Sequence, residues 1–134
     1  MIVKFLVADD SGVMRKMIIE TLYQGNVFNP ENALIFEAAD GEAGLELFQK
    51  TLPQVVLADT EMPKMDGVAM SKKIRELDRK VPIIMFAAEG GEAAVREALS
   101  AGVITDYVVK PVQPGMLEEK LLKAFETLKG EENA

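Results

Sequence analysis

The feature that most constrains the fold is an alternation, repeated five times, of a short apolar run with a segment of helical periodicity. The segments between and after the runs place apolar residues three or four positions apart, which is typical of a helix with one buried face. Such alternation predicts a parallel sheet covered by helices on both faces. The runs expected to be strands are 2–8, 33–38, 54–58, 81–87 and 105–109.

The length of the chain limits the topology that this sheet can have. With 134 residues, one compact domain over 1–134 is the simplest organisation. Right-handed crossovers favour a doubly wound open sheet, because a closed eight-stranded barrel would need about twice the chain. Ser11 is placed to cap the first helix. The acidic end is too short for a second domain, and we expect 129–134 to be a frayed tail.

Charge and composition exclude several classes of function. A net charge of -7 disfavours nucleic acid and anionic membrane surfaces, because both would repel the chain. The absence of Cys and His excludes disulfides, thiolate zinc sites and imidazole bases, so any metal must be held by oxygen atoms. No export signal or long apolar span is visible, which favours a cytoplasmic protein without membrane partners.

Acidic residues follow two of the predicted strands at their carboxyl ends. Asp9 and Asp10 follow the first strand, and Asp59 follows the third. Ligands of open α/β sheets bind outside these ends, so neighbouring strands would bring the three carboxylates together. Each is more often a helix cap or turn residue when taken alone, but their common location favours a site. Mutual repulsion would be relieved by a divalent cation: oxygen ligands favour Mg²⁺, Mn²⁺ or Ca²⁺, and a site with few protein ligands and room for water suits Mg²⁺.

A cation of the chain itself follows the fifth predicted strand. Lys110 is placed to hold an anionic oxygen opposite the metal. A carboxylate nucleophile, a divalent cation and an ammonium group together suit phosphoryl transfer, whose transition state spreads negative charge over equatorial oxygens. The expected product is an aspartyl phosphate. Without His in this chain, a protein phosphodonor would have to be a separate molecule.

Four stretches of the sequence resemble the receiver domain of two-component response regulators, in its single-domain, CheY-like form. They are "FLVADDSGVMRK" at 5–16, "EAADGEAGLELF" at 37–48, "VVLADTEMPKMDG" at 55–67 and "DYVVKP" at 106–111. The resemblance covers nearly the whole chain and implies a doubly wound (βα)5, flavodoxin-like parallel sheet. The strand order it implies is 2-1-3-4-5, the order known for CheY.

The resemblance also implies roles for the acidic residues. Asp59 corresponds to the phosphoacceptor, and Asp9 and Asp10 to the acidic pair, with Asp10 expected to bind Mg²⁺ more directly. Glu61 occupies the position whose backbone carbonyl completes the metal site. Magnesium, or manganese in its place, is therefore the cofactor that the family pattern implies.

Three further positions concern phosphoryl contact and switching. Lys110 corresponds to the lysine that contacts the phosphoryl group, and its bond to Pro111 is expected to be cis. Tyr107 corresponds to the aromatic residue that changes rotamer on activation, on the surface of the fourth helix, fifth strand and fifth helix.

One position departs from the family pattern. The family has Ser or Thr at the end of the fourth strand, where its hydroxyl bonds the phosphoryl oxygen, and this chain has Ala87. A missing donor to a charged acceptor is worth about 1.5–3 kcal/mol. Phosphorylation of Asp59 could survive that loss, whereas coupling from the phosphate to Tyr107 is in question. Glu61 and Glu89 are expected to flank the site, either altering attack by water or as ordinary solvated residues.

The leading hypothesis is a stand-alone receiver in a phosphorelay, with chemotaxis as one candidate process. A histidine kinase or histidine phosphotransfer protein would phosphorylate Asp59, and a target protein would bind the switching surface. Enzymatic activity would be limited to self-phosphorylation from small donors and autodephosphorylation. The main alternative is a pseudo-receiver that docks without phosphate, because Ala87 lacks the hydroxyl.

Two other functions fit the sequence less well. An aspartate-nucleophile phosphatase uses D-x-D, whereas this chain has "DTE" with Glu61 at the second position. A flavodoxin-type FMN site needs a phosphate loop rich in Gly and hydroxyls after the first strand, and "ADDSG" is acidic there.

Overall fold

The computed structural model contains one parallel sheet of five strands in the order β2-β1-β3-β4-β5. It describes the backbone of residues 1–133 and the side chains of residues 1–127. The predicted doubly wound topology and strand order are confirmed, with each strand boundary within two residues of its expected position. The strands are β1 (Val3–Ala8), β2 (Ala33–Ala38), β3 (Val55–Asp59), β4 (Ile83–Ala87) and β5 (Asp106–Val109).

A helix follows each strand, as the periodicity predicts. The helices are α1 (Gly12–Gln24), α2 (Gly41–Thr51), α3 (Gly67–Leu77), α4 (Glu92–Ser100) and α5 (Pro114–Asn133). Helix α5 therefore continues through 129–133, where we expected a frayed tail, and residue 134 lies outside the described residues. None of the helices in the described chain is both long enough and apolar enough to span a membrane.

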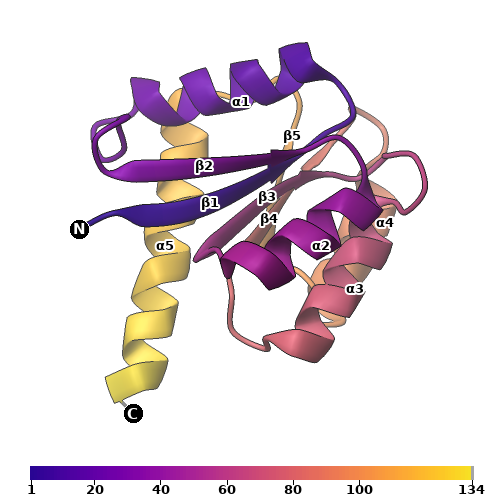
Figure 1. Ribbon diagram of the computed structural model, residues 1–134. Coiled ribbons are helices and arrows are strands. Elements are labelled where there is room, and N and C mark those ends of the chain that lie inside the picture. Colours follow the sequence, from indigo (N-terminus) through magenta and orange to yellow (C-terminus); the bar gives the residue numbers. More distant parts are fainter. Residues whose placement is uncertain (134) are drawn as a thin grey trace.

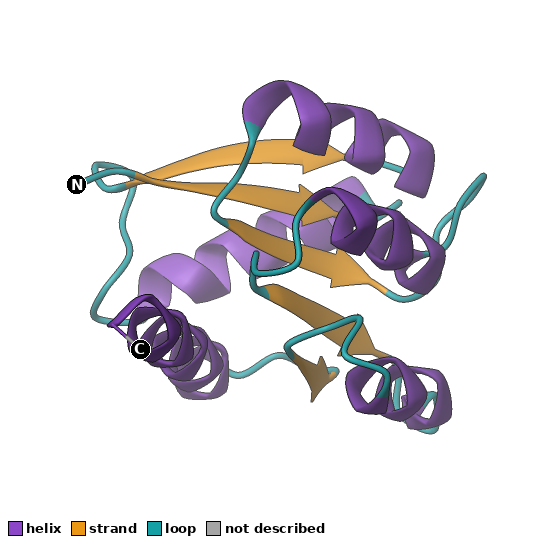
Figure 2. Ribbon diagram, turned by 90° about the horizontal axis from the view of Figure 1, so that it is seen from below, coloured by secondary structure: helices purple, strands orange, loops and turns teal. Residues whose placement is uncertain are grey.

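The sheet separates two layers of helices, with α1 and α5 on one face and α2, α3 and α4 on the other (Figures 1 and 2). Alternate residues of each strand point to opposite faces, so every strand contributes to two apolar cores. In β3, Leu57 belongs to the same core as Ile18 and Leu117, while Val56 belongs to the other core with Phe48 and Ile74. Burial on both faces explains why the central strands are continuous apolar runs in the sequence.

Local interactions at the carboxyl edge of the sheet place the helix starts next to the candidate site. The Ser11 hydroxyl accepts a hydrogen bond from the Met14 amide at 3.2 Å, which confirms the predicted cap of α1. Gly67 begins α3 against the backbone of Asp59, where a Cβ atom would collide with the Asp59 carbonyl oxygen. Helices α1 and α3 therefore begin shortly after strands β1 and β3, whose carboxyl ends carry the acidic residues.

Candidate functional site

Three aspartates meet at the carboxyl edge of the sheet. Asp9 and Asp10 follow β1, Asp59 is the last residue of β3, and the two strands are neighbours with Ala8 opposite Ala58. Asp9, Asp10 and Asp59 each offer a carboxylate oxygen, and these oxygens all lie within 4.8 Å of one another. Asp9 and Asp59 are buried, whereas Asp10 is exposed. The predicted convergence of the acidic residues is thus confirmed.

Lys110 reaches this cluster from the end of β5. Its ammonium nitrogen lies 3.2 Å from Asp59 Oδ1 and 3.9 Å from Asp9 Oδ2. The Lys110 amide donates to the carbonyl of Ala87 at 2.9 Å, and the Lys110–Pro111 bond is cis, as expected. These contacts hold the lysine beside two buried carboxylates.

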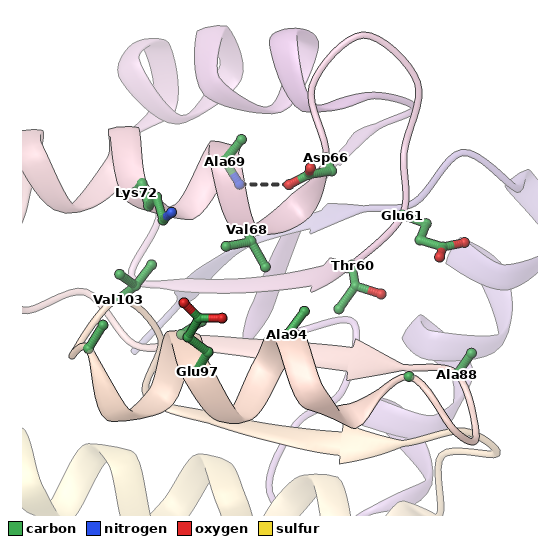
Figure 3. A pocket seen from close by; sticks show the side chains of 13 residues that line it. Thr60, Glu61, Asp66, Val68, Ala69, Lys72, Ala88, Ala94, Glu97 and Val103 are labelled. Atoms are coloured by element: carbon green, nitrogen blue, oxygen red, sulfur yellow. Dashed lines mark hydrogen bonds between the residues drawn. The ribbon is translucent and has the colours of Figure 1, made fainter.

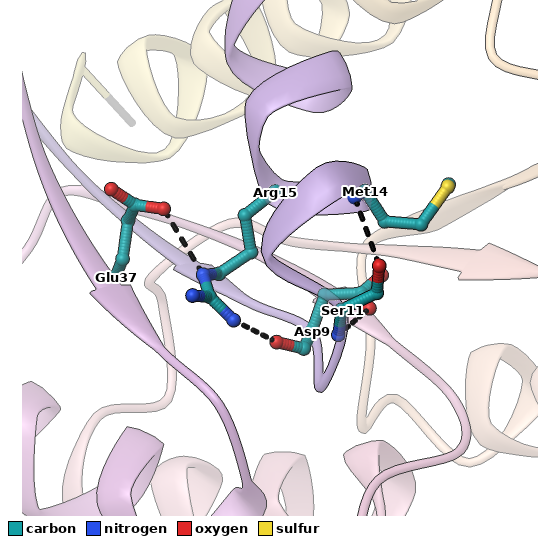
Figure 4. A network of polar contacts seen from close by, with 5 residues as sticks. All are labelled: Asp9, Ser11, Met14, Arg15 and Glu37. Carbon is teal, nitrogen blue, oxygen red and sulfur yellow. Dashed lines mark hydrogen bonds and ion pairs between the residues drawn. The ribbon is translucent and has the colours of Figure 1, made fainter.

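The orientation of Asp9 is fixed by hydrogen bonds on three of its groups, and Figure 4 shows those to Ser11 and Arg15. Its amide donates to the Ala38 carbonyl at 3.0 Å, and its Oδ1 accepts from the Ser11 amide at 2.9 Å. Its carbonyl accepts from Arg15 Nη1 at 2.8 Å, while Arg15 Nε pairs with Glu37 Oε1 at 3.0 Å. Arg15 and Glu37 were not predicted as site residues. Glu37 lies on β2, so only the pairing of β2 with β1 brings it to the arginine.

The remaining oxygen of Asp9 has a long ion pair with Lys110 but accepts no hydrogen bond among the described residues. This atom, Asp9 Oδ2, is buried. Burial raises the pKa of Asp9, the negative charges of Asp59 and Asp10 add to the rise, and the Ser11 amide and Lys110 oppose it. A buried carboxylate oxygen beside two more carboxylates fits a divalent cation that prefers oxygen ligands. The residues present therefore fit the cation that the sequence pattern implies.

The other residues predicted for the site lie around this cluster. Ala87 ends β4 and is fully buried, so the position expected to carry a hydroxyl presents only a methyl group. Glu61 and Glu89 are exposed on the loops after β3 and β4. The metal-ligand role of the Glu61 carbonyl and the flanking roles of both glutamates stay predictions.

Tyr107 lies on β5, away from the three aspartates. It is partly buried and packs against the core under α2, α3 and α4. It also lines a groove of about 570 Å³ between β5 and α5, together with Met116 and Lys120. Its position on the expected switching surface is therefore accessible, while the change of rotamer stays a prediction.

A cleft of about 470 Å³ runs between α3 and α4 and ends near the aspartates at Thr60, Glu61 and Ala88 (Figure 3). Lys72 of α3 and Glu97 of α4 lie among its lining residues. The sequence reasoning did not anticipate this cleft. Its one sequence signal is the series of small residues on the facing helices and at the C-cap of α4, which are Ala69, Ala94, Ala98 and Ala101.

The fold and the site together define a doubly wound α/β protein with an acidic cluster, which fits a divalent cation, and a lysine at the carboxyl edge of its sheet. Residues 5–122 match the family model of the response regulator receiver domain, and the chain belongs to this family. Receiver domains are the phosphoacceptors of two-component signalling rather than enzymes with turnover of a substrate.

Two relatives align with most of the chain. Chemotaxis protein CheY1 of Helicobacter pylori is 40% identical over 124 residues, which are 88% of this chain and 93% of that protein. A protein-glutamate methylesterase/protein-glutamine glutaminase of a Nocardioides species is 37% identical over 128 residues. That match covers 94% of this chain but spans only 34% of the methylesterase.

A solved structure has the same fold. The REC domain of AraT, a response regulator from Geobacillus stearothermophilus, matches with a TM-score of 0.81 and 32% identity. The match covers 98% of this chain and 99% of that domain. The receiver fold therefore accounts for the whole sheet and for its five helices.

Proposed function

We propose that this protein is a phosphorylation-controlled switch in a two-component phosphorelay and that Asp59 accepts the phosphoryl group. The observation that carries this proposal is the contact of 3.2 Å between Lys110 Nζ and Asp59 Oδ1 beside two further carboxylates. Asp59 is largely buried and sits at the end of a rigid central strand, which orients its carboxylate. An oriented nucleophile next to a fixed cation suits transfer of an anionic group.

In the proposed reaction an oxygen of Asp59 attacks the phosphorus of the donor. A P–O bond to Asp59 forms while the P–N bond of a phosphohistidine breaks, and the electron pair leaves with the imidazole nitrogen. With a small donor such as acetyl phosphate, the P–O bond to the acetyl group breaks and acetate leaves. Lys110 Nζ balances negative charge on the phosphoryl oxygens throughout.

Asp9, Asp10 and Asp59, with the backbone carbonyl of Glu61, are the groups that would hold Mg²⁺ or Mn²⁺. When bound, the cation neutralises charge on the carboxylates and on the transferring phosphoryl group. Support for this assignment comes from the buried Oδ2 of Asp9, which accepts no hydrogen bond among the described residues. Arg15 acts here as a positioning residue, because it holds the carbonyl of Asp9.

The proposed partners follow from the family and from the surface of the chain. The donor is a histidine kinase or a histidine phosphotransfer protein in the cytoplasm, and the target is a protein that binds the face formed by α4, β5 and α5. The groove beside Tyr107 supports this choice of face, since it gives a partner access to β5. Chemotaxis is a candidate process because Helicobacter CheY1, a chemotaxis protein, matches over nearly its full length.

A second candidate function is favoured by Ala87. The side chain at this position is fully buried and carries no hydroxyl, so the end of β4 offers no side-chain donor to a phosphoryl oxygen. In this alternative the protein is a pseudo-receiver that docks to its partner with or without phosphate on Asp59.

Mass spectrometry after incubation with Mg²⁺ and acetyl phosphate tests the proposal. We expect a phosphate-sized mass increase that disappears in Asp59→Asn and when EDTA replaces Mg²⁺. Asp66→Asn serves as the matched control, because Asp66 caps α3 and lies outside the aspartate cluster. An increase that survives in Asp59→Asn would exclude Asp59 as acceptor. If the increase occurs but binding to the target does not change, the pseudo-receiver hypothesis is the correct one.

A further inference from the structure

The amino ends of β4 and β5, opposite the aspartate cluster, carry a concentration of positive charge. Five of the fifteen Lys and Arg residues of this acidic chain lie between positions 72 and 80. None of the five forms an ion pair within 4.0 Å among the residues that the structure describes. They are Lys72, Lys73, Arg75, Arg79 and Lys80.

Three of these cations surround one small cavity of about 190 Å³. It lies between the end of α3, the connection from α4 to β5, and α5, and we call it the basal cavity. Its polar lining consists of Arg75, Arg79, Lys80, Thr105 and Thr127. Within the described part of the chain, no acidic residue lines it. At about 30 Å³ for each molecule of liquid water, this volume corresponds to about six water molecules.

Hydrogen-bond donors in the basal cavity exceed the acceptors that the protein supplies. Arg75 donates from Nη1 to the Asp78 carbonyl at 3.2 Å and from Nη2 to Thr105 Oγ1 at 3.3 Å. Its Nε has no partner in the described residues, but it is closed to solvent and does not face the cavity. Thr105 Oγ1 also accepts from the Ile83 amide at 3.0 Å, so its own proton remains available for donation. Burial lowers the pKa of Arg75, and the negative charge of Asp78 opposes this shift.

We propose that the basal cavity binds a phosphate group, either as the free ion or as part of a phosphorylated small molecule. Charged donors line it from α3 and from the loop after α3, the Thr105 hydroxyl lines it just before β5, and a tetrahedral oxyanion can accept from several directions at once. A carboxylate has only two oxygens in one plane and would leave donors unused. This site is separate from Asp59 and does not depend on the proposed phosphoacceptor function.

Titration with inorganic phosphate, followed by NMR, tests the proposal. The ionic strength is held constant, EDTA removes divalent cations, and Asp59→Asn excludes effects at the aspartate cluster. We expect saturable shifts of the Gly102, Ile104 and Thr105 amides. The double variant Arg79→Gln/Lys80→Gln loses charged hydrogen-bond donors, and its phosphate affinity should fall by about tenfold or more.

The control is Lys72→Gln/Lys73→Gln, which removes the same charge from α3 but changes no residue of the basal cavity. It should retain phosphate affinity within about twofold, because exposed charges interact weakly at physiological salt. Phosphate shifts without saturation, equal weakening in both double variants, or equally strong binding of acetate would each overturn the proposal. Comparison with glycerol phosphate separates the two sources: tighter binding of the ester indicates a phosphorylated small molecule, and tighter binding of inorganic phosphate indicates the free ion.

Discussion

Lys110 Nζ lies 3.2 Å from Asp59 Oδ1, although the strand β4 separates β3 from β5 in the sheet. The lysine therefore reaches across the carboxyl end of β4, where Ala87 is the last residue. Replacing Lys110 therefore removes the positive charge that faces both Asp59 and Asp9.

We expect Lys110→Gln to bind Mg²⁺ more tightly and to be phosphorylated more slowly. The loss of one positive charge beside three carboxylates should raise Mg²⁺ affinity by about tenfold, which corresponds to about 1.4 kcal/mol. The phosphoryl oxygens lose a cationic partner, so the rate with acetyl phosphate should fall by about tenfold or more. Calorimetry and timed mass spectrometry measure the two effects. Unchanged values for both would show that the contact has no role in the site.

The raised pKa of Asp9 predicts a pH dependence of stability in the absence of metal. Burial raises this pKa above the ordinary value of 3.8, so the folded protein holds the proton to higher pH than the unfolded chain. The resulting stabilisation is fully present below pH 3.8 and is lost as the pH rises through the folded-state pKa. Urea unfolding in EDTA should show the parent losing stability relative to Asp9→Asn over this range.

Mg²⁺ provides the control for this pH effect, because it binds the ionised carboxylate. Adding Mg²⁺ above this range should stabilise the parent more than Asp9→Asn. A difference between the two proteins that stays constant with pH in EDTA would contradict the prediction.

Arg15 should affect the cation site without contacting the cation. Its bond to the Asp9 carbonyl and its ion pair with Glu37 fix the start of the loop after β1. We expect Arg15→Ala to weaken Mg²⁺ binding by about tenfold. Losses of this size are typical when a residue that orients a metal ligand, without binding the metal, is mutated. Glu37→Gln keeps the bond to Asp9 and should change the affinity by no more than about threefold. Equal losses in the two variants would assign the effect to the ion pair instead.

Ala87→Thr tests whether the missing hydroxyl limits switching. A new bond to a phosphoryl oxygen should stabilise the phosphorylated form by about 1.5–3 kcal/mol and increase the phosphorylation-dependent change at Tyr107. Ala87→Val is the matched control, because valine has nearly the same shape as threonine and no hydroxyl. NMR of Tyr107 before and after phosphorylation provides the measurement. If both variants behave like the parent, the hydroxyl is immaterial in this protein.

Gly67 should be intolerant of any side chain, because a Cβ atom there would collide with the Asp59 carbonyl and the Met85 side chain. We expect Gly67→Ala to lower the free energy of unfolding by about 1–3 kcal/mol through overpacking. Gly115→Ala is the control, since nothing lies within 4 Å of its added Cβ. It should be neutral or stabilising by up to about 1 kcal/mol, as alanine favours a helix. Chemical unfolding compares the two variants, and equal stabilities would contradict the close contact.

The local pattern of the sequence was sufficient to predict the parallel sheet and the acidic residues at its carboxyl edge, whereas the strand order that brings Asp9, Asp10 and Asp59 together came from the resemblance to receiver domains. Apolar runs are typical of strands buried on both faces of a parallel sheet. Residues that follow such runs lie at the carboxyl edge of the sheet, however the side chains pack. Lys110 could be predicted for the same reason. The start of α1 at Ser11 was equally local, because a helix cap involves neighbours in the chain.

Contacts between distant segments depended on the tertiary structure. Glu37 meets Arg15 only because β2 pairs with β1, and the basal cavity forms only where α3, α5 and the start of β5 meet. The lack of a hydrogen bond at Asp9 Oδ2 likewise results from burial by several elements together. The sequence determined the secondary structure and the residues at the edge of the sheet, because periodicity and strand ends are local properties. The tertiary structure decided which polar atoms remain without partners, because packing brings together side chains that lie far apart in the chain.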